Sequence, residues 1–266
     1  MIRRILVALT FAATLAAQTF IQMSDPQFGM YTGNQGFDHE TANFEFAVAT
    51  ANRLKPAFVV LTGDLVNAAG DAAQIEEFKR VAGKLDPNIR LFLMPGNHDV
   101  GNEPTKESLA KYRQQFGPDY YTFRVGEITG IVLNSNLEKG AQDVPAEAAK
   151  MEAWFRGELA QAQRDKHVIV FQHIPFFLND ANEEDRYENI PRETRQRYLK
   201  MLHEYGVKQV FAGHYHSTSE ARDGDLEMIT TGPVGKPTPP AKSGLRIVTV
   251  TPAGVTQKYY DFGELP

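Results

Sequence analysis

The chain has 266 residues and a formal net charge of −5, and 42% of its residues are apolar. This composition can build a full hydrophobic core and argues against nucleic-acid binding through bulk positive charge. The absence of cysteine excludes disulfides, thiolate zinc sites and thiol nucleophiles, and it leaves the redox compartment open.

The N-terminal segment has the pattern of an export signal. Two arginines precede an apolar run, Ile5 to Ala16, which is too short to cross a bilayer comfortably, and Leu15-Ala16-Ala17 resembles a cleavage site. The alternatives are a first strand or helix of the fold, or an uncleaved anchor. Because residues 19–24 already form a complete short strand pattern, we expect a signal peptide at 1–17 and a folded domain at 18–266. The protein would then be exported, periplasmic or secreted, with no stable membrane insertion after cleavage.

Short apolar runs alternate with amphipathic helices along the rest of the chain. Unbroken apolar runs of strand length indicate a sheet that is covered on both faces. The expected strands lie at residues 20–23, 58–61, 91–94, 120–125, 129–134, 167–171, 208–211, 227–231, 245–251 and 255–260. The expected helices lie at residues 39–55, 72–85, 105–116, 146–166 and 191–205. With no internal repeat or clear linker, the pattern favours one α/β domain with two packed sheets and flanking helices.

Side chains that can bind metal or transfer protons follow five of these strands. In the most prominent case an apolar strand ends at Pro95 and is followed by Gly96-Asn97-His98-Asp99. The other such residues are Asp25 and Gln27, Asp64, His173, and His214 with His216. Each alone has an ordinary interpretation as a helix cap, a turn residue or a buried histidine. Their recurrence at strand ends, where open α/β folds place their sites, favours one shared site.

This set of motifs resembles the calcineurin-like metallophosphoesterase family. That family has the blocks Asp-x-His, Gly-Asp, Gly-Asn-His-Asp/Glu, a lone His, and Gly-His-x-His. The matching segments here are Asp25-Pro26-Gln27, Gly63-Asp64, Gly96-Asn97-His98-Asp99, His173 and Gly213-His214-Tyr215-His216. The segments Ser-Asp-Pro-Gln-Phe-Gly, Val-Phe-Gln-His-Ile-Pro and Ala-Gly-His-Tyr-His resemble those of one branch of the family, whose members are described as serine/threonine protein phosphatases.

The resemblance implies a four-layer α-β-β-α sandwich that holds two divalent metal ions. A carboxylate has two oxygens and can bridge two metals, and the resemblance gives this position to Asp64. The remaining implied ligands are Asp25, Gln27 and His216 at the first metal, and Asn97, His173 and His214 at the second.

His98 and Asp99 are the catalytic residues that the resemblance implies. His98 would contact the phosphoryl group and donate a proton to the leaving oxygen as a general acid. Asp99 would orient His98 and favour its charged form.

Gln27 departs from the commonest family pattern, which has histidine at this position. An amide oxygen ligand would make the first site harder and would favour Mn²⁺, Fe²⁺ or Mg²⁺ over zinc. If Gln27 does not reach the metal, the first site would be weak and would fill only at high metal concentration.

We therefore expect a binuclear metal-dependent phosphoesterase that hydrolyses phosphate monoesters of a small molecule or a phosphoprotein, with phosphoserine and phosphothreonine as candidate substrates. No nucleic-acid partner is expected. A phosphodiesterase or nucleotide pyrophosphatase is the first alternative, and a non-catalytic phosphate-binding protein is the second. Intact His98 and Asp99 argue against the second, because simple binding needs no proton donor. For Tyr31, Phe177 and Tyr187, we expect loop packing rather than contact with a substrate.

Overall fold

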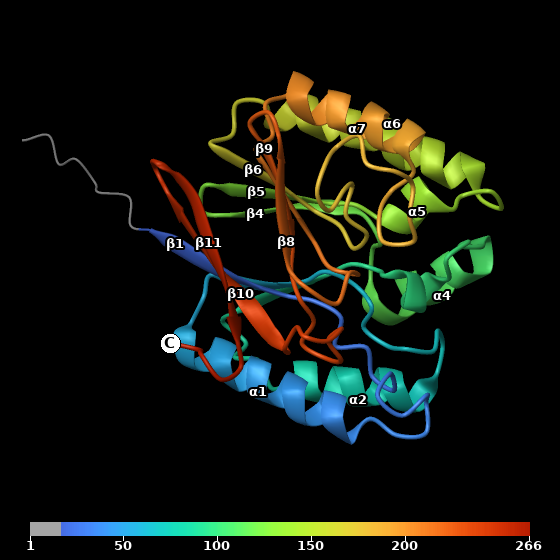
Figure 1. Cartoon of the computed structure of the whole chain (residues 1–266), viewed down its shortest axis with the longest axis vertical. Coiled ribbons are helices and arrows are strands. Elements are labelled where there is room, and N and C mark those ends of the chain that lie inside the picture. The colour runs from blue at the N-terminus through green and yellow to red at the C-terminus, as the bar shows by residue number, and fades with distance from the viewer. Residues whose placement is uncertain (1–16) are drawn as a thin grey trace, which may run out of the picture.

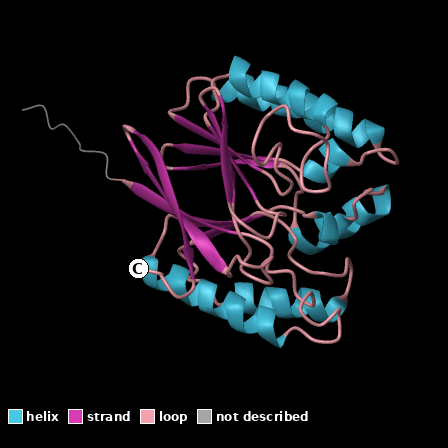
Figure 2. Ribbon diagram, in the orientation of Figure 1, coloured by secondary structure: helices cyan, strands magenta, loops and turns pink. Residues whose placement is uncertain are grey.

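Two mixed β-sheets lie at the centre of the structure, a computed structural model that describes residues 17–266 (Figure 1, Figure 2). The predicted signal peptide lies outside the described residues apart from Ala17. The five-stranded sheet has the order β11-β10-β1-β2-β3 and the six-stranded sheet the order β4-β5-β6-β7-β9-β8. The strands of the first sheet are β1 (Gln18–Met23), β2 (Phe58–Leu61), β3 (Arg90–Leu93), β10 (Gly244–Thr251) and β11 (Gly254–Asp261). Those of the second are β4 (Tyr121–Val125), β5 (Ile128–Val132), β6 (His167–Phe171), β7 (Gln209–Ala212), β8 (Ser219–Asp223) and β9 (Leu226–Thr230).

Helices cover the outer faces of both sheets. In Figure 1, α1 and α2 lie beneath the five-stranded sheet, and α6 and α7 lie above the six-stranded one. The apolar residues of α1 recur at helical spacing (Phe44, Ala47, Val48 and Ala51) and are buried. The helices are α1 (Asp38–Leu54), α2 (Ala72–Ala82), α3 (Asn97–Val100), α4 (Lys106–Phe116), α5 (Ser135–Lys139), α6 (Pro145–Ala162) and α7 (Arg192–Glu204). The predicted four-layer α-β-β-α sandwich is confirmed. Within residues 17–266, no helix is both long enough and apolar enough to span a bilayer.

Aromatic rings join the two sheets across their shared interface. Phe20 of β1 stacks on Phe58 of β2 with ring centroids 4.6 Å apart, and it meets Phe171 of β6 edge-on at 5.7 Å. Phe92 of β3 stacks on Phe123 of β4. Such pairs add specific geometry to the burial of large apolar surfaces. This packing fixes the position of one sheet relative to the other, and with it the loops at the strand ends.

The structure differs from the expected elements mainly at polar segments. Helix α2 ends at Ala82 rather than residue 85, because Gly83 has a low helix propensity. Strand β8 was not expected, since Ser219–Asp223 is polar, and it pairs only at the edge of its sheet. The short helices α3 and α5 were also missed. The predicted hairpin is present, with Tyr121 of β4 opposite Val132 of β5.

Candidate metal centre

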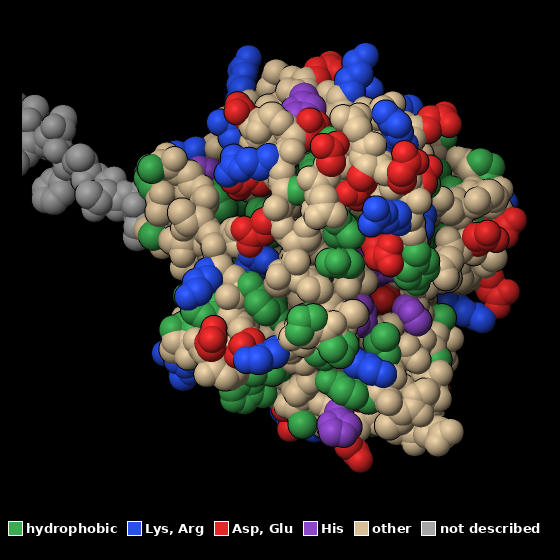
Figure 3. Space-filling view, viewed as in Figure 1, with side chains coloured by type: hydrophobic (Ala, Val, Ile, Leu, Met, Phe, Trp, Pro, Cys, Tyr) green, Lys and Arg blue, Asp and Glu red, His purple; other side chains and the backbone are tan. Residues whose placement is uncertain are grey.

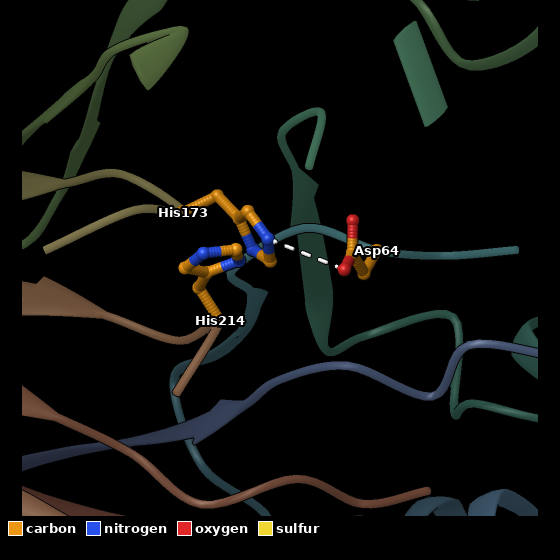
Figure 4. Close-up of side chains that lie close together, drawn as sticks. All are labelled: Asp64, His173 and His214. Atoms are coloured by element: carbon orange, nitrogen blue, oxygen red, sulfur yellow. Dashed lines mark ion pairs between the residues drawn. The ribbon is translucent and has the colours of Figure 1, made fainter. Parts of the chain in front are cut away.

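The predicted site residues all follow strands, in loops or, for Asn97, His98 and Asp99, in the short helix α3. Strands β1, β2 and β3 run parallel to one another, and so do β6 and β7, so the carboxyl ends within each group lie at one edge. Asp64, which follows β2, therefore comes close to His173 after β6 and His214 after β7. Figure 4 shows these three side chains pointing toward one another from separate loops. In Figure 3, histidine side chains surround a recessed acidic side chain on this face of the molecule.

Two groups of ligand-type side chains form within this space, and they share Asp64. One group is Asp64, His173 and His214, and the other is Asp25, Asp64 and His216. In each group one potential ligand atom per residue lies within 4.8 Å of the others, and all five residues are buried. The structure thus brings together carboxylates and imidazoles from both sheets.

Backbone carbonyls determine which nitrogen of each histidine faces the carboxylates. A carbonyl oxygen can only accept a hydrogen bond, so the ring nitrogen beside it must carry the hydrogen. The three pairs are His173 Nδ1 with Thr62 O at 2.7 Å, His214 Nε2 with Tyr187 O at 3.1 Å, and His216 Nδ1 with Lys236 O at 2.5 Å. When the ring is neutral, its other nitrogen has a lone pair, which is the arrangement typical of metal-binding histidines.

The atoms around His173 need a positive charge between them. Its Nε2 lies 3.3 Å from Asp64 Oδ2 and 3.2 Å from Asn97 Oδ1, so three lone-pair acceptors meet. Burial opposes a charge on His173, but the carboxylates of Asp64 and Asp25 outweigh it and raise the pKa of His173 to about 9. Burial and the charge of His173 lower the pKa of neighbouring His214 to about 4. A divalent cation would satisfy the same acceptors as the proton, so this donor set fits a metal.

Gln27 carries a further oxygen of ligand type, two residues after Asp25 of the second group. Its Oε1 is buried and has no hydrogen-bond partner among residues 17–266. Its Nε2 donates to Asn67 Oδ1 at 3.3 Å, and Asn67 Nδ2 in turn donates to Asn34 Oδ1 at 2.7 Å. This chain of amides fixes the orientation of the Gln27 amide and leaves its oxygen as an unpaired acceptor. An unpaired buried acceptor costs about 1–3 kcal/mol, which a cation would offset.

Left-handed backbone conformations recur at the site. Non-glycine residues with positive φ cost roughly 1–3 kcal/mol each and persist only where the surroundings enforce them. Those at the site are Asp25 (φ 49°), Gln27 (43°), Asp64 (50°), His214 (68°) and His216 (56°). Hydrogen bonds between the loops hold them, since Asp25 N donates to Gly63 O at 3.1 Å and Gln27 N donates to Asp64 O at 2.9 Å.

Gly96 is required by the close approach of two loops. A Cβ atom at this position would lie 2.1 Å from Asp64 Oδ1 and 2.3 Å from Asp64 N. The absence of a side chain lets His98 N donate to Asp64 Oδ1 at 2.8 Å. The Gly-Asn-His-Asp segment is therefore seated directly on the carboxylate that the two groups share.

Comparison with known proteins identifies the family of this site. The model of the calcineurin-like phosphoesterase family matches residues 19–218. The chain belongs to this family. It is therefore a metal-dependent phosphoric ester hydrolase of a family that uses a dinuclear metal site.

The curated relatives of this phosphoesterase are similar over almost the whole chain. Serine/threonine-protein phosphatase CPPED1 of Bos taurus is 37% identical over 263 residues, which cover 92% of this chain and 84% of the relative. The CPPED1 of Homo sapiens is 35% identical over 264 residues, with the same coverage of both chains.

Solved structures share the fold at low sequence identity. Purple acid phosphatase PPD1 from yellow lupin (Lupinus luteus) has a TM-score of 0.70 at 13% identity, covering 94% of this chain and 52% of the lupin chain. A dimetal phosphatase from Danio rerio has a TM-score of 0.63 at 14% identity, covering 92% of this chain and 99% of that chain.

Asp99 does not contact the His98 side chain, so our prediction that it orients His98 directly is wrong. The Asp99 carboxylate accepts hydrogen bonds from the backbone N–H groups of Gly96 at 2.8 Å, Leu65 at 3.0 Å and Val66 at 3.2 Å. Burial and the nearby charge of Asp64 raise the pKa of Asp99 to about 7, although these N–H groups oppose the shift. In this phosphoesterase Asp99 therefore joins the loops after β2 and β3.

Asn67 supplies the contact on His98 that we had expected from Asp99. Its carbonyl oxygen lies 2.9 Å from His98 Nδ1. The sequence gives little sign of this role, because a backbone carbonyl is available from any residue type. The same reason explains why the carbonyls of Thr62, Tyr187 and Lys236, which accept hydrogen bonds from the three candidate metal-binding histidines, were not predicted.

Replacing Asp99 should affect the stability of the phosphoesterase. We expect Asp99→Asn to lower the free energy of unfolding by about 1.5–3 kcal/mol, because an amide keeps one acceptor oxygen and turns an NH₂ group toward backbone donors. Urea unfolding measures this change. Asp143→Asn, at an exposed position, is the matched control and should leave stability unchanged. If Asp99→Asn instead had normal stability but lost phosphoesterase activity, the result would support a role of Asp99 in orienting His98.

Proposed function

We propose that the chain hydrolyses phosphate monoesters, with phosphoserine and phosphothreonine residues of proteins as its substrate class. Hydrolysis is supported by the two groups of ligand-type side chains that share Asp64. Half-buried His98 lies beside them, and its backbone N–H donates a hydrogen bond to the Asp64 carboxylate. The substrate class is supported by the 35–37% identity to serine/threonine-protein phosphatases over 92% of the chain.

Seven residues would hold two divalent ions. Asp25, Gln27 and His216 would hold one ion, Asn97, His173 and His214 the other, and Asp64 would bind both. When bound, the ions neutralise charge on the phosphoryl group and lower the pKa of a water molecule. The unpaired Gln27 Oε1 supports an oxygen-rich first site, for which we propose Mn²⁺, Fe²⁺ or Mg²⁺ in preference to zinc.

His98 would donate the proton that the leaving oxygen needs. Its Nδ1 must carry hydrogen because it faces the Asn67 carbonyl, so Nε2 is the atom available to a substrate. Its backbone N–H is bonded to Asp64 Oδ1, which sets the distance of the acid from the shared ligand. Two contacts thus orient His98 without a hydrogen bond between its side chain and the Asp99 carboxylate.

We also propose export from the cytoplasm, followed by removal of residues 1–17. The support is the N-terminal pattern of two arginines, a short apolar run and a small-residue site. The folded domain of residues 18–266 would then act in the periplasm or outside the cell.

A substrate panel tests the proposed reaction. The purified chain is assayed with p-nitrophenyl phosphate, bis(p-nitrophenyl) phosphate, ADP-ribose and a phosphoserine peptide, each with Mn²⁺, Zn²⁺ or Mg²⁺. We expect metal-dependent turnover of the monoester and the phosphopeptide, fastest with Mn²⁺. Preference for the diester or ADP-ribose would contradict monoester specificity, and no turnover with any metal would contradict hydrolysis.

The control for this panel is His98→Ala, assayed beside the wild type. It should keep its metal content, because His98 binds no metal, and it should lose most turnover, roughly 10²-fold or more. Loss of metal in this variant would show that His98 is a ligand instead.

A second prediction concerns the metal preference of the first site. We expect Gln27→His to strengthen Zn²⁺ binding roughly tenfold relative to Mn²⁺, because imidazole is a softer ligand than an amide oxygen. Calorimetric titration of the metal-free protein with each ion gives both dissociation constants. Gln163→His, at an exposed position, is the control. If both affinities stay unchanged in Gln27→His, position 27 is not a ligand.

A further inference from the structure

Tyr187 lies in the loop between β6 and α7 and contacts two predicted ligands of the second metal. Its hydroxyl oxygen accepts a hydrogen bond from Asn97 Nδ2 at 3.0 Å, and its carbonyl faces His214 Nε2. Its ring centroid lies 4.9 Å from that of His214. Yet 53% of the residue is exposed to solvent. Tyr187 thus contacts predicted metal ligands on one side and solvent on the other.

Lys139 holds this part of the loop in place. Its ammonium donates to the carbonyls of Arg186, Tyr187 and Asn189 at 2.9, 2.8 and 2.6 Å, which uses all three of its hydrogens. It also lies 5.7 Å from the centre of the Tyr187 ring. Because the lysine belongs to α5, the position of Tyr187 is fixed from a second element and is not left to the loop alone.

The hydrogen of the Tyr187 hydroxyl is available to a ligand. The Asn97 NH₂ group can only donate, so the phenol oxygen acts as acceptor in that contact. Among residues 17–266 the phenol O–H itself has no acceptor. Asn97 Oδ1 lies 3.2 Å from His173 Nε2, on the side of the predicted second metal. An anion at that metal would therefore lie near a free hydrogen-bond donor.

We propose that Tyr187 is a substrate-binding residue, whose hydroxyl donates a hydrogen bond to a phosphoryl oxygen and whose exposed ring contacts the group that carries the phosphate. This inference rests on the proposed function and adds a specificity-determining residue outside the metal ligands.

The test compares Tyr187→Phe with the wild type, because this change keeps the ring and the carbonyl and removes only the hydroxyl. The inhibition constant of inorganic phosphate against p-nitrophenyl phosphate should rise roughly tenfold or more, as expected for loss of a hydrogen bond to a charged group. The KM for p-nitrophenyl phosphate should rise with it. Phosphate binding to the metal-loaded variant, measured by calorimetry, should weaken by the same factor, and metal content should stay at the wild-type value.

The matched control is Tyr260→Phe on β11, which lies away from the metal centre and should leave both constants unchanged. If the wild type is active and Tyr187→Phe has unchanged phosphate affinity, this inference is overturned while the proposed function stands. Loss of metal with unchanged phosphate affinity in the reloaded variant would also overturn it. A wild type that hydrolyses no phosphate ester with any metal would instead overturn the proposed function.

Discussion

The burial of two carboxylates, Asp25 and Asp64, is the constraint on which the rest of the site depends. A buried charge is costly unless it is paired and hydrogen-bonded. The backbone N–H groups of His98 and His214 provide part of this compensation, at 2.8 and 3.2 Å. Neutral imidazoles do not provide the rest, because three carbonyls hold the ring hydrogens on the far nitrogens and turn the lone pairs toward the carboxylates, so a proton, as on His173, or a metal ion must lie between these groups. The arrangement is therefore complete only with positive charge at its centre, which in a phosphoesterase also serves to bind an anionic substrate.

Packing of the sheets sets the distances within the site. Asp25, Asp64 and Asn97 come from the five-stranded sheet, and the three histidines from the six-stranded sheet. A shift between the sheets would separate them, and the aromatic contacts around Phe20 oppose such a shift. Buried Gln22 adds a polar link, since its Nε2 on β1 donates to Ala212 O on β7 at 2.9 Å. The left-handed residues show that this rigid frame enforces backbone conformations that the loops alone would not adopt.

The sequence was informative where function depends on side-chain type at strand ends. The apolar strands, the four layers and the convergence of residues such as Asp64 and His173 followed from strand patterns and from the motif resemblance. The sequence was uninformative where backbone atoms act, as in the contact of Asn67 O with His98. It was misleading for Asp99, whose position beside His98 in the chain suggested a contact that the short helix α3 prevents by turning the carboxylate toward backbone donors. Polar edge strand β8 carries no apolar signal, so tertiary pairing alone reveals it.

Metal stoichiometry tests the central claim, a two-ion site organised by one shared carboxylate, most directly. The measurement is elemental analysis of the purified chain after loading with Mn²⁺ and removal of free ions, for the wild type and for Asp64→Asn. Asparagine tolerates the left-handed conformation of residue 64 but has only one oxygen with which to bind metal. A two-ion site organised by Asp64 predicts two ions per wild-type chain and loss of both in a folded Asp64→Asn protein. A single ion in the wild type, or two ions retained by Asp64→Asn, would contradict it.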